Sequence, residues 1–179
     1  MPSLLLTYAT THGHTAKIAD RLAEALRAHG LDVDVRDVKQ IGDRVPGSYD
    51  AVIAGASLHA GHHQRAMLNW VKANRDRLTD RPTLFFSVSL TAAEDTAEAR
   101  EATQRSIDDF EEETGWKPTR SESVAGALQY REYDVFTRVL MRLKMRHAGH
   151  HEDPSLDHEY TDWEALRQWA EEFAAGLTD

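Results

Sequence analysis

The sequence of 179 residues contains no cysteine, and this absence excludes several kinds of chemistry. Without thiols the chain has no disulfide, no iron–sulfur cluster and no cysteine nucleophile. Its apolar stretches are all far shorter than the roughly 20 residues that a membrane-spanning helix needs. The N-terminus lacks the basic, apolar and small-residue order of a signal peptide. We therefore expect a cytoplasmic protein.

Positive charge is also scarce, because 21 Lys and Arg residues face 30 Asp and Glu residues, a formal net charge of -9. This balance argues against a nucleic-acid partner. The hydrophobic share of 41% and the charged share of 28% are ordinary for a globular protein. The length suits one domain with a substantial core. We expect a single domain over residues 1–179, and the oligomeric state stays open.

Strand and helix patterns alternate along the chain. Short apolar runs and apolar–polar alternations predict strands, and apolar residues at helical spacing separate them. Strands are expected at residues 3–8, 31–36, 51–54, 83–90 and 123–128. This order predicts an α/β fold, a three-layer sandwich in which helices cover both faces of a five-stranded parallel sheet.

Four helices are expected between and after these strands. The first begins near Ala16, and the second carries Trp70 on its inner face. The polar segment 93–114 has a thin apolar stripe, which predicts a mostly exposed helix. The sequence Thr161-Asp162-Trp163-Glu164 predicts a capping box at the start of the last helix.

Three loops are expected at the carboxyl ends of the strands, where open α/β sheets bind ligands: residues 9–15, 55–63 and 87–93. The first contains Thr10-Thr11-His12-Gly13-His14-Thr15 and leads into a helix, so its backbone N–H groups would face one spot. It lacks the lysine of a P-loop and the glycine spacing of a dinucleotide fingerprint. Hydroxyls and amides without a cation suit a phosphate monoester held without Mg²⁺. The alternative is an ordinary strand–helix turn with a threonine N-cap.

The motif Tyr8-x-Thr10-x-x-Gly13-x-Thr15-x-x-x-Ala19-x-x-Leu22 resembles the FMN-binding signature of flavodoxins. Further blocks at residues 55–62, 86–90, 125–130 and 160–164 resemble the menaquinone-dependent protoporphyrinogen IX dehydrogenases. The resemblance runs from Leu4 to about Phe173. It includes an extra segment before the last helix that ordinary flavodoxins lack.

This resemblance implies a flavodoxin-like sheet of strand order 2-1-3-4-5 and FMN as the cofactor. It also implies the oxidation of protoporphyrinogen IX to protoporphyrin IX, a step of heme biosynthesis, with a membrane quinone as the electron acceptor. Ser89 stands where the family has Asn, and His59-Ala60 stands where it tends to have a basic residue followed by an aromatic one. The implied FMN contacts are Thr10, Thr11, His12, Gly13, His14 and Thr15 for the phosphate, and Ser57, Leu58, His59, Ala60, Gly61, Ser87, Val88, Ser89, Leu90 and Thr91 for the ring.

Residues 130–160 interrupt the alternation as a helical insertion with a basic, amphipathic character. Such a helix could dock on an anionic membrane surface, and the chain would then be peripheral on the inner face of the cell membrane. Its arginines could equally hold the propionates of a porphyrinogen. The alternative is a helix packed on its own domain with a solvated basic face. The candidate contacts are Arg131, Arg138, Arg142, Lys144 and Arg146.

The ten histidines raise the question of a metal, but no H-E-x-x-H or comparable ligand pattern occurs, so we expect none. His62 matches the family by position and is the candidate for proton handling, because histidine is the side chain that ordinarily changes charge near neutral pH. It could also merely order its loop. The sequence thus predicts an FMN-dependent oxidoreductase. The alternatives are a flavodoxin-type electron carrier, another FMN-dependent quinone reductase, or a module that has lost the flavin.

Overall fold

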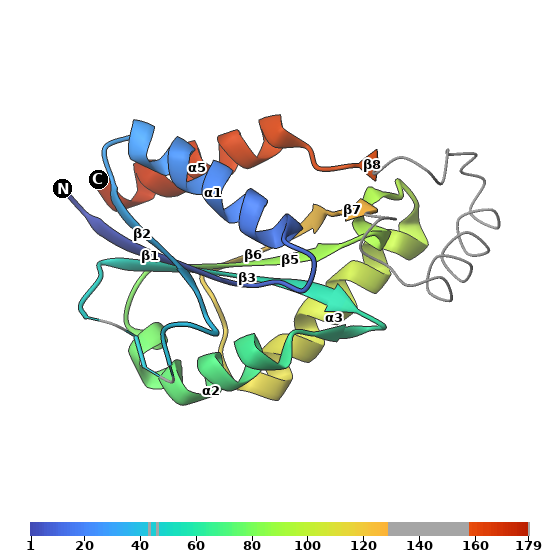
Figure 1. The fold of residues 1–179 in the computed structure, drawn as a ribbon, viewed down its shortest axis with the longest axis horizontal. Helices are drawn as coiled ribbons and strands as arrows, with labels where there is room; N and C mark the ends of the chain where they lie inside the picture. The colour runs from blue at the N-terminus through green and yellow to red at the C-terminus, as the bar shows by residue number, and fades with distance from the viewer. Residues whose placement is uncertain (43, 46, 129–157, 179) are drawn as a thin grey trace.

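The computed structural model describes residues 1–42, 44, 45, 47–128 and 158–178. Its central sheet has the strand order β2-β1-β3-β5-β6, and neighbouring strands along this path are parallel. This confirms the predicted order 2-1-3-4-5, in which β5 and β6 are the fourth and fifth long strands (Figure 1). The strands are β1 (Ser3–Ala9), β2 (Asp32–Asp37), β3 (Ala51–His59), β5 (Thr83–Ser89) and β6 (Arg120–Ala125).

Helices cover both faces of this sheet. Helices α1 (His14–Ala28) and α5 (Trp163–Thr178) lie together on one face. Helices α2 (Arg65–Thr79) and α3 (Ala97–Thr114) lie on the other (Figure 1). The predicted three-layer sandwich is confirmed. Among the described residues, no helix combines the length and the apolar character that crossing a membrane would require.

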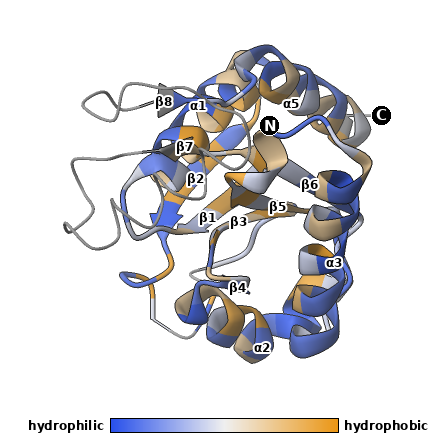
Figure 2. Ribbon diagram, turned by 90° about the vertical axis from the view of Figure 1, so that its right-hand side faces the viewer, coloured by the Kyte–Doolittle hydropathy of each residue, from blue (hydrophilic) through white to orange (hydrophobic). Residues whose placement is uncertain are grey.

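Two apolar cores hold the layers together, one on each face of the sheet. In β1, Leu4 and Leu6 pack into the core under α1 and α5, while Leu5 packs into the core over α2 and α3. All three side chains are fully buried, and each contributes about 1.5–3 kcal/mol by leaving water. The central strands are therefore apolar on both sides, whereas the helices carry hydrophilic and hydrophobic residues interspersed along their ribbons (Figure 2).

Helix α3 starts later than predicted. A 3-10 turn occupies Thr91–Ala93, and Thr96 caps α3 by accepting a hydrogen bond from the backbone N–H of Ala99. The predicted exposed character is confirmed for most positions, but Ile107 and Phe110 are buried against the sheet. The cap decides the start of the helix, and apolar spacing alone does not show it.

The segment predicted as a loop at residues 55–63 is a β-hairpin. Strand β3 continues to His59, and β4 (His62–His63) folds back antiparallel to it. Ala60 and Gly61 form the turn with positive φ angles of 48° and 82°, as a two-residue turn of type I′ requires. Pairing with β4 extends the strand beyond its buried part, so no apolar pattern marks this extension.

The strand predicted at residues 123–128 is divided in two. Strand β6 starts at Arg120 and ends at Ala125, and Gly126 follows it. Strand β7 (Ala127–Leu128) then pairs antiparallel with β8 (His158–Glu159) in a separate small sheet. Residues 129–157 lie outside the described residues, and with them most of the predicted helical insertion.

Candidate functional site

A pocket opens where the carboxyl ends of β1, β3 and β5 meet, the end of the sheet where this fold class binds ligands. It brings together all three segments that the sequence singled out. Four of the predicted site residues are not among the described residues that line it: Thr11, Gly13, Ser87 and His62. The lining residues are Thr10, His12, His14, Thr15, Ser57, Leu58, His59, Ala60, Gly61, Val88, Ser89, Leu90, Thr91, Gly126 and Ala127.

The turn between β1 and α1 presents an uncapped helix N-terminus to this pocket. Gly13 is the N-cap residue, with a φ of 85° that glycine adopts without strain. No side chain caps α1, and its first turn contains no acidic residue. The backbone N–H of Gly13 instead donates to Thr10 Oγ1 at 2.9 Å. Thr10 can then donate its own O–H to a ligand, and the start of α1 suits an anion.

Lys39 brings a cation to this turn, although the sequence predicted none there. Its Nζ donates to the carbonyl oxygen of Thr10 at 2.9 Å. Lys39 follows β2, and Val38 N–H donates to the carbonyl of Tyr8, so the residues after β2 lie beside those after β1. The strand order 2-1-3 is the signal that could have placed Lys39 here. The ammonium group holds the turn from outside the pocket lining.

Gln64 connects two walls of the pocket, and sequence reasoning also missed it. Its Nε2 donates to Thr11 Oγ1 and, at 3.0 Å, to Ser57 Oγ. Both hydroxyls thereby accept a hydrogen bond and keep their own hydrogens available for a ligand or a neighbour. Gln64 is the N-cap residue of α2, so the start of this helix holds the turn at residues 10–15 against the end of β3.

The side chain of His14 does not serve as a cation for an anionic ligand. Its Nε2 lies 2.7 Å from Thr161 Oγ1, and the Thr161 hydroxyl donates to the carbonyl of Ala125 at 2.7 Å. Nε2 of His14 is therefore the donor in the first bond. Burial lowers the pKa of His14, and the opposing attraction of Glu159 is smaller. The predicted phosphate-facing histidine is thus a neutral link between α1 and the residues before α5.

The predicted capping box is displaced by one residue. Asp162 Oδ1, and not the Thr161 hydroxyl, accepts from the backbone N–H groups of Glu164 and Ala165 at 3.1 and 3.0 Å. Thr161 is buried, and its hydroxyl is already engaged by His14 and Ala125. Both residue types cap helices well, so tertiary contacts decide which of the two does so here.

The hairpin separates three histidines by environment. His59 lies at the rim of the pocket, where its ring meets that of His12 edge to face with centroids 5.5 Å apart. His62, the predicted catalytic residue, is exposed on β4 as His59 is on β3, but it does not line the pocket. His63 is buried below, with Nε2 2.8 Å from Ser87 Oγ. This bond also explains why the Ser87 hydroxyl is not part of the pocket lining.

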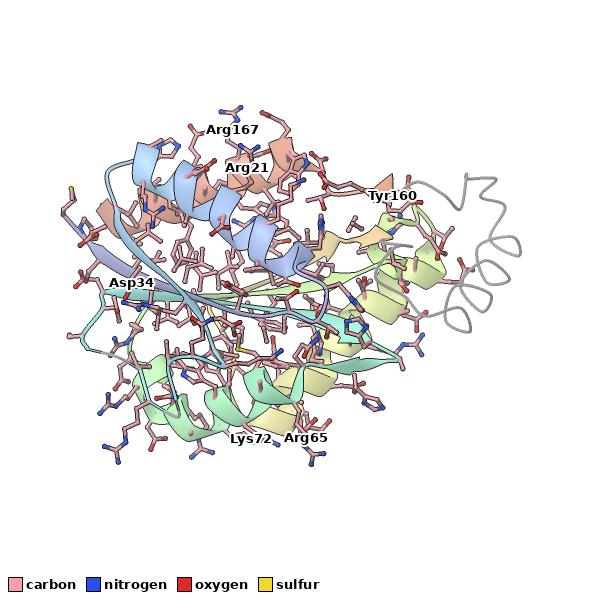
Figure 3. The ribbon with its side chains drawn as sticks, viewed as in Figure 1. Arg21, Asp34, Arg65, Lys72, Tyr160 and Arg167 are labelled. Atoms are coloured by element: carbon pink, nitrogen blue, oxygen red, sulfur yellow. The ribbon has the colours of Figure 1, made fainter. Side chains whose placement is uncertain are left out.

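The described lining carries no Asp, Glu, Lys or Arg side chain, and its titratable groups are three histidines, His12, His14 and His59. The cations that Figure 3 labels lie elsewhere: Arg21 and Arg167 on the outer side of α1 and α5, and Arg65 and Lys72 on α2. Within the described ranges, no three potential ligand side chains gather to hold a metal ion. The predicted substrate or membrane contacts Arg131, Arg138, Arg142, Lys144 and Arg146 lie outside these ranges.

Comparisons with known proteins support the same reading of the fold. The flavodoxin domain model matches residues 5–155. The protoporphyrinogen IX dehydrogenase (quinone) of Leishmania major is 37% identical over 178 residues, which cover 97% of this chain and 75% of that protein. The enzyme of the same name from Escherichia coli strain K12 is 34% identical over 175 residues, 98% and 96% of the two chains. The structure of the Streptococcus pneumonia TIGR4 flavodoxin superposes with a TM-score of 0.58 at 20% sequence identity. The superposition covers 97% of this chain and 99% of that flavodoxin.

Family membership points to FMN as the cofactor, and the described residues fit it. The uncapped start of α1, with threonine hydroxyls beside it, supplies donors for a phosphate monoester. The hairpin and the segment after β5 offer uncharged walls for the ring. The chain belongs to the flavodoxin-domain family and is an FMN-type oxidoreductase that groups with the protoporphyrinogen IX dehydrogenases.

Proposed function

We propose that this oxidoreductase oxidises protoporphyrinogen IX to protoporphyrin IX and passes the electrons to a quinone. One observation carries the proposal: relatives named for this reaction align with 97–98% of the chain at 34–37% identity. The alignment includes the pocket segments and the residues beyond β6, which a likeness in the phosphate turn alone would not require. The quinone acceptor rests on the same printed names.

The turn at residues 10–15 would bind the FMN phosphate. The hydroxyls of Thr10 and Thr15 and the N–H groups at the start of α1 are its donors, and Lys39 holds the turn in place. Thr15 is buried, so its hydroxyl has little access to water. Thr15→Val should therefore weaken FMN binding by about 10- to 100-fold, as expected for losing a hydrogen bond to a charged group.

The ring would lie between residues 57–61 and 88–91. When bound, FMN would supply a two-electron acceptor, and the six-electron oxidation would use it three times. The protein's own contribution is positional. Gln64 fixes the end of β3 to the phosphate turn, and the hydrogen bond from Gly126 N–H to the Ser89 carbonyl, 3.0 Å long, fixes the residue before β7 to the last residue of β5. These contacts join the segments that surround the pocket.

A flavodoxin-type electron carrier is the second candidate, and the surface of α3 favours it. This helix exposes a row of carboxylates that could dock a basic redox partner. The exposed acidic residues of α3 are Glu98, Glu101, Asp108, Asp109, Glu112 and Glu113, and Glu111 beside them is half-buried. A carrier would exchange single electrons with such a partner and leave porphyrinogen untouched.

We also propose a peripheral membrane contact, because a membrane quinone has to reach the flavin. The basic residues at 131–146 are its expected site. Sedimentation with vesicles decides this point. Binding to vesicles with anionic lipid that falls as salt is raised supports the contact, and absence of binding to either anionic or neutral vesicles contradicts it.

A steady-state assay tests the proposed reaction. FMN-loaded protein is mixed with protoporphyrinogen IX and a menaquinone analogue, and protoporphyrin fluorescence is followed against the rate without protein. Thr15→Val is the matched control, because it should lose FMN and activity together and recover both at high FMN concentration. Protein that retains its flavin but produces no porphyrin above the background rate contradicts the proposal.

A further inference from the structure

Two histidines from different segments meet in the pocket. His12 belongs to the turn after β1, and His59 is the last residue of β3. Their rings stand edge to face, with centroids 5.5 Å apart and an angle of 67° between the planes. The third histidine of the lining, His14, is engaged as a donor to Thr161. The described lining therefore offers this pair as its groups for moving a proton.

The hairpin turn holds His59 in a particular position. The next residue, Ala60, has a φ of 48°, a left-handed conformation that alanine rarely adopts. Such strain is typical of functional sites, where the surrounding structure maintains it. Here the pairing of His59 with His62 across β3 and β4 maintains it. The strained residue and His59 both line the pocket.

The surroundings of His59 keep its imidazole neutral. His59 is exposed at the pocket rim, but the atoms packed around its ring desolvate it enough to lower its pKa, and the neighbouring His12 lowers it further. No carboxylate lines the described pocket to oppose this effect, and the ring of His14 is bonded to Thr161. At neutral pH one ring nitrogen of His59 is therefore unprotonated and able to accept a proton.

We propose that His59 accepts the proton that the substrate releases during oxidation, and that His12 passes it to solvent. This inference rests on the proposed function. A methylene C–H bond of the porphyrinogen breaks and its hydride goes to the bound flavin. A pyrrole N–H bond breaks, its electron pair forms a C=N bond in the macrocycle, and the proton goes to the unprotonated nitrogen of His59. A quinone then takes these two electrons with two protons, and three such rounds complete the six-electron oxidation to protoporphyrin IX.

Three glutamine variants test this role in the FMN-loaded protein. H59Q should lower kcat by about 100-fold or more, the usual contribution of a general base, and remove the fall of kcat at acid pH. H12Q should lower kcat less. H62Q is the matched control, since His62 is the exposed cross-strand neighbour of His59, and its kcat should equal that of the wild type. The Kd for FMN should stay unchanged in H62Q, and the loss of kcat in H59Q should persist at saturating FMN.

Two readouts separate a proton acceptor from a structural residue. Added imidazole should restore part of the turnover of H59A, which a purely structural loss would not allow. In histidine NMR titrations of the flavin-loaded protein, H12Q should raise the pKa of His59, because His12 lowers it in the wild type.

Several results would overturn the assignment. His59 is refuted as the acceptor if H59Q keeps the kcat and the pH profile of the wild type. It is equally refuted if H62Q loses turnover and H59Q does not. A His59 that titrates at or above the ordinary histidine pKa in the holoprotein would do the same, whatever the kinetics. Wild-type protein that binds FMN but leaves porphyrinogen unoxidised overturns the proposed function itself, and the role of His59 toward that substrate falls with it.

Discussion

His63 gives the folded chain a dependence on pH that can be measured without substrate. The ring is 8% exposed, it contacts Phe85 and Phe110 edge to face, and its Nε2 is bonded to Ser87. Burial lowers the pKa of His63 to about 4, and the attraction of Glu113 opposes this only in part. Protonation would place a charge among aromatic rings, where it is poorly solvated.

The sign and size of the effect follow from the two pKa values. In the unfolded chain His63 titrates near 6.5, whereas in the folded chain its pKa is about 4. Above about pH 6.5 both states are neutral and the full stability is present. As the pH falls, the unfolded state binds a proton first, so folding loses about 2 kcal/mol by about pH 5 and about 3 kcal/mol below pH 4.

Urea unfolding of the wild type and of His63→Gln, both saturated with FMN, measures this loss. Glutamine can still bond Ser87 but does not titrate. The free energy of unfolding of the wild type relative to His63→Gln should fall by about 2 kcal/mol between about pH 7.5 and pH 5. His62→Gln is the control, and its curve should run parallel to the wild type. Parallel curves for His63→Gln as well would refute a buried, neutral His63.

Three further substitutions test packing and capping. Gly55→Ala should cost about 1–3 kcal/mol in urea unfolding, because the new Cβ would lie 1.9 Å from the Phe86 ring; wild-type stability would contradict that packing. Thr161→Val should cost about 2 kcal/mol, since the Ala125 carbonyl and His14 both lose a partner, and unchanged thermal unfolding would count against this link. Asp162→Ala should lower the free energy of unfolding by about 1 kcal/mol, because it removes the cap of α5. An unchanged melting temperature of this variant would show that another group caps the helix.

The parts of the fold that sequence reasoning predicted are those governed by local pattern. The run Leu4-Leu5-Leu6 is apolar because helices cover both of its faces, so the strand and its burial follow from one observation. The turn at residues 10–15 follows from its small and hydroxyl residues. The strand order came from the family resemblance, since local pattern does not specify which strands are neighbours.

The parts that sequence reasoning missed depend on contacts through space. Lys39 and Gln64 reach the phosphate turn from 29 and 53 residues away, and neither belongs to a recognisable motif. The hairpin at residues 55–63 has no apolar alternation, because β4 and not the core completes it. His59 and His62 are three residues apart in a histidine-rich stretch. Only the path of the turn between them decides which one lines the pocket.

Anaerobic single-turnover mixing tests the central claim, which is that the flavin of this chain carries electrons from a porphyrinogen to a quinone. With the FMN-loaded protein in excess, protoporphyrinogen IX should bleach the flavin absorbance while protoporphyrin fluorescence appears, with three flavins reduced for each protoporphyrin formed. A menaquinone analogue added afterwards should restore the flavin absorbance at a comparable rate. A flavin that dithionite reduces but protoporphyrinogen IX leaves fully oxidised would contradict the account.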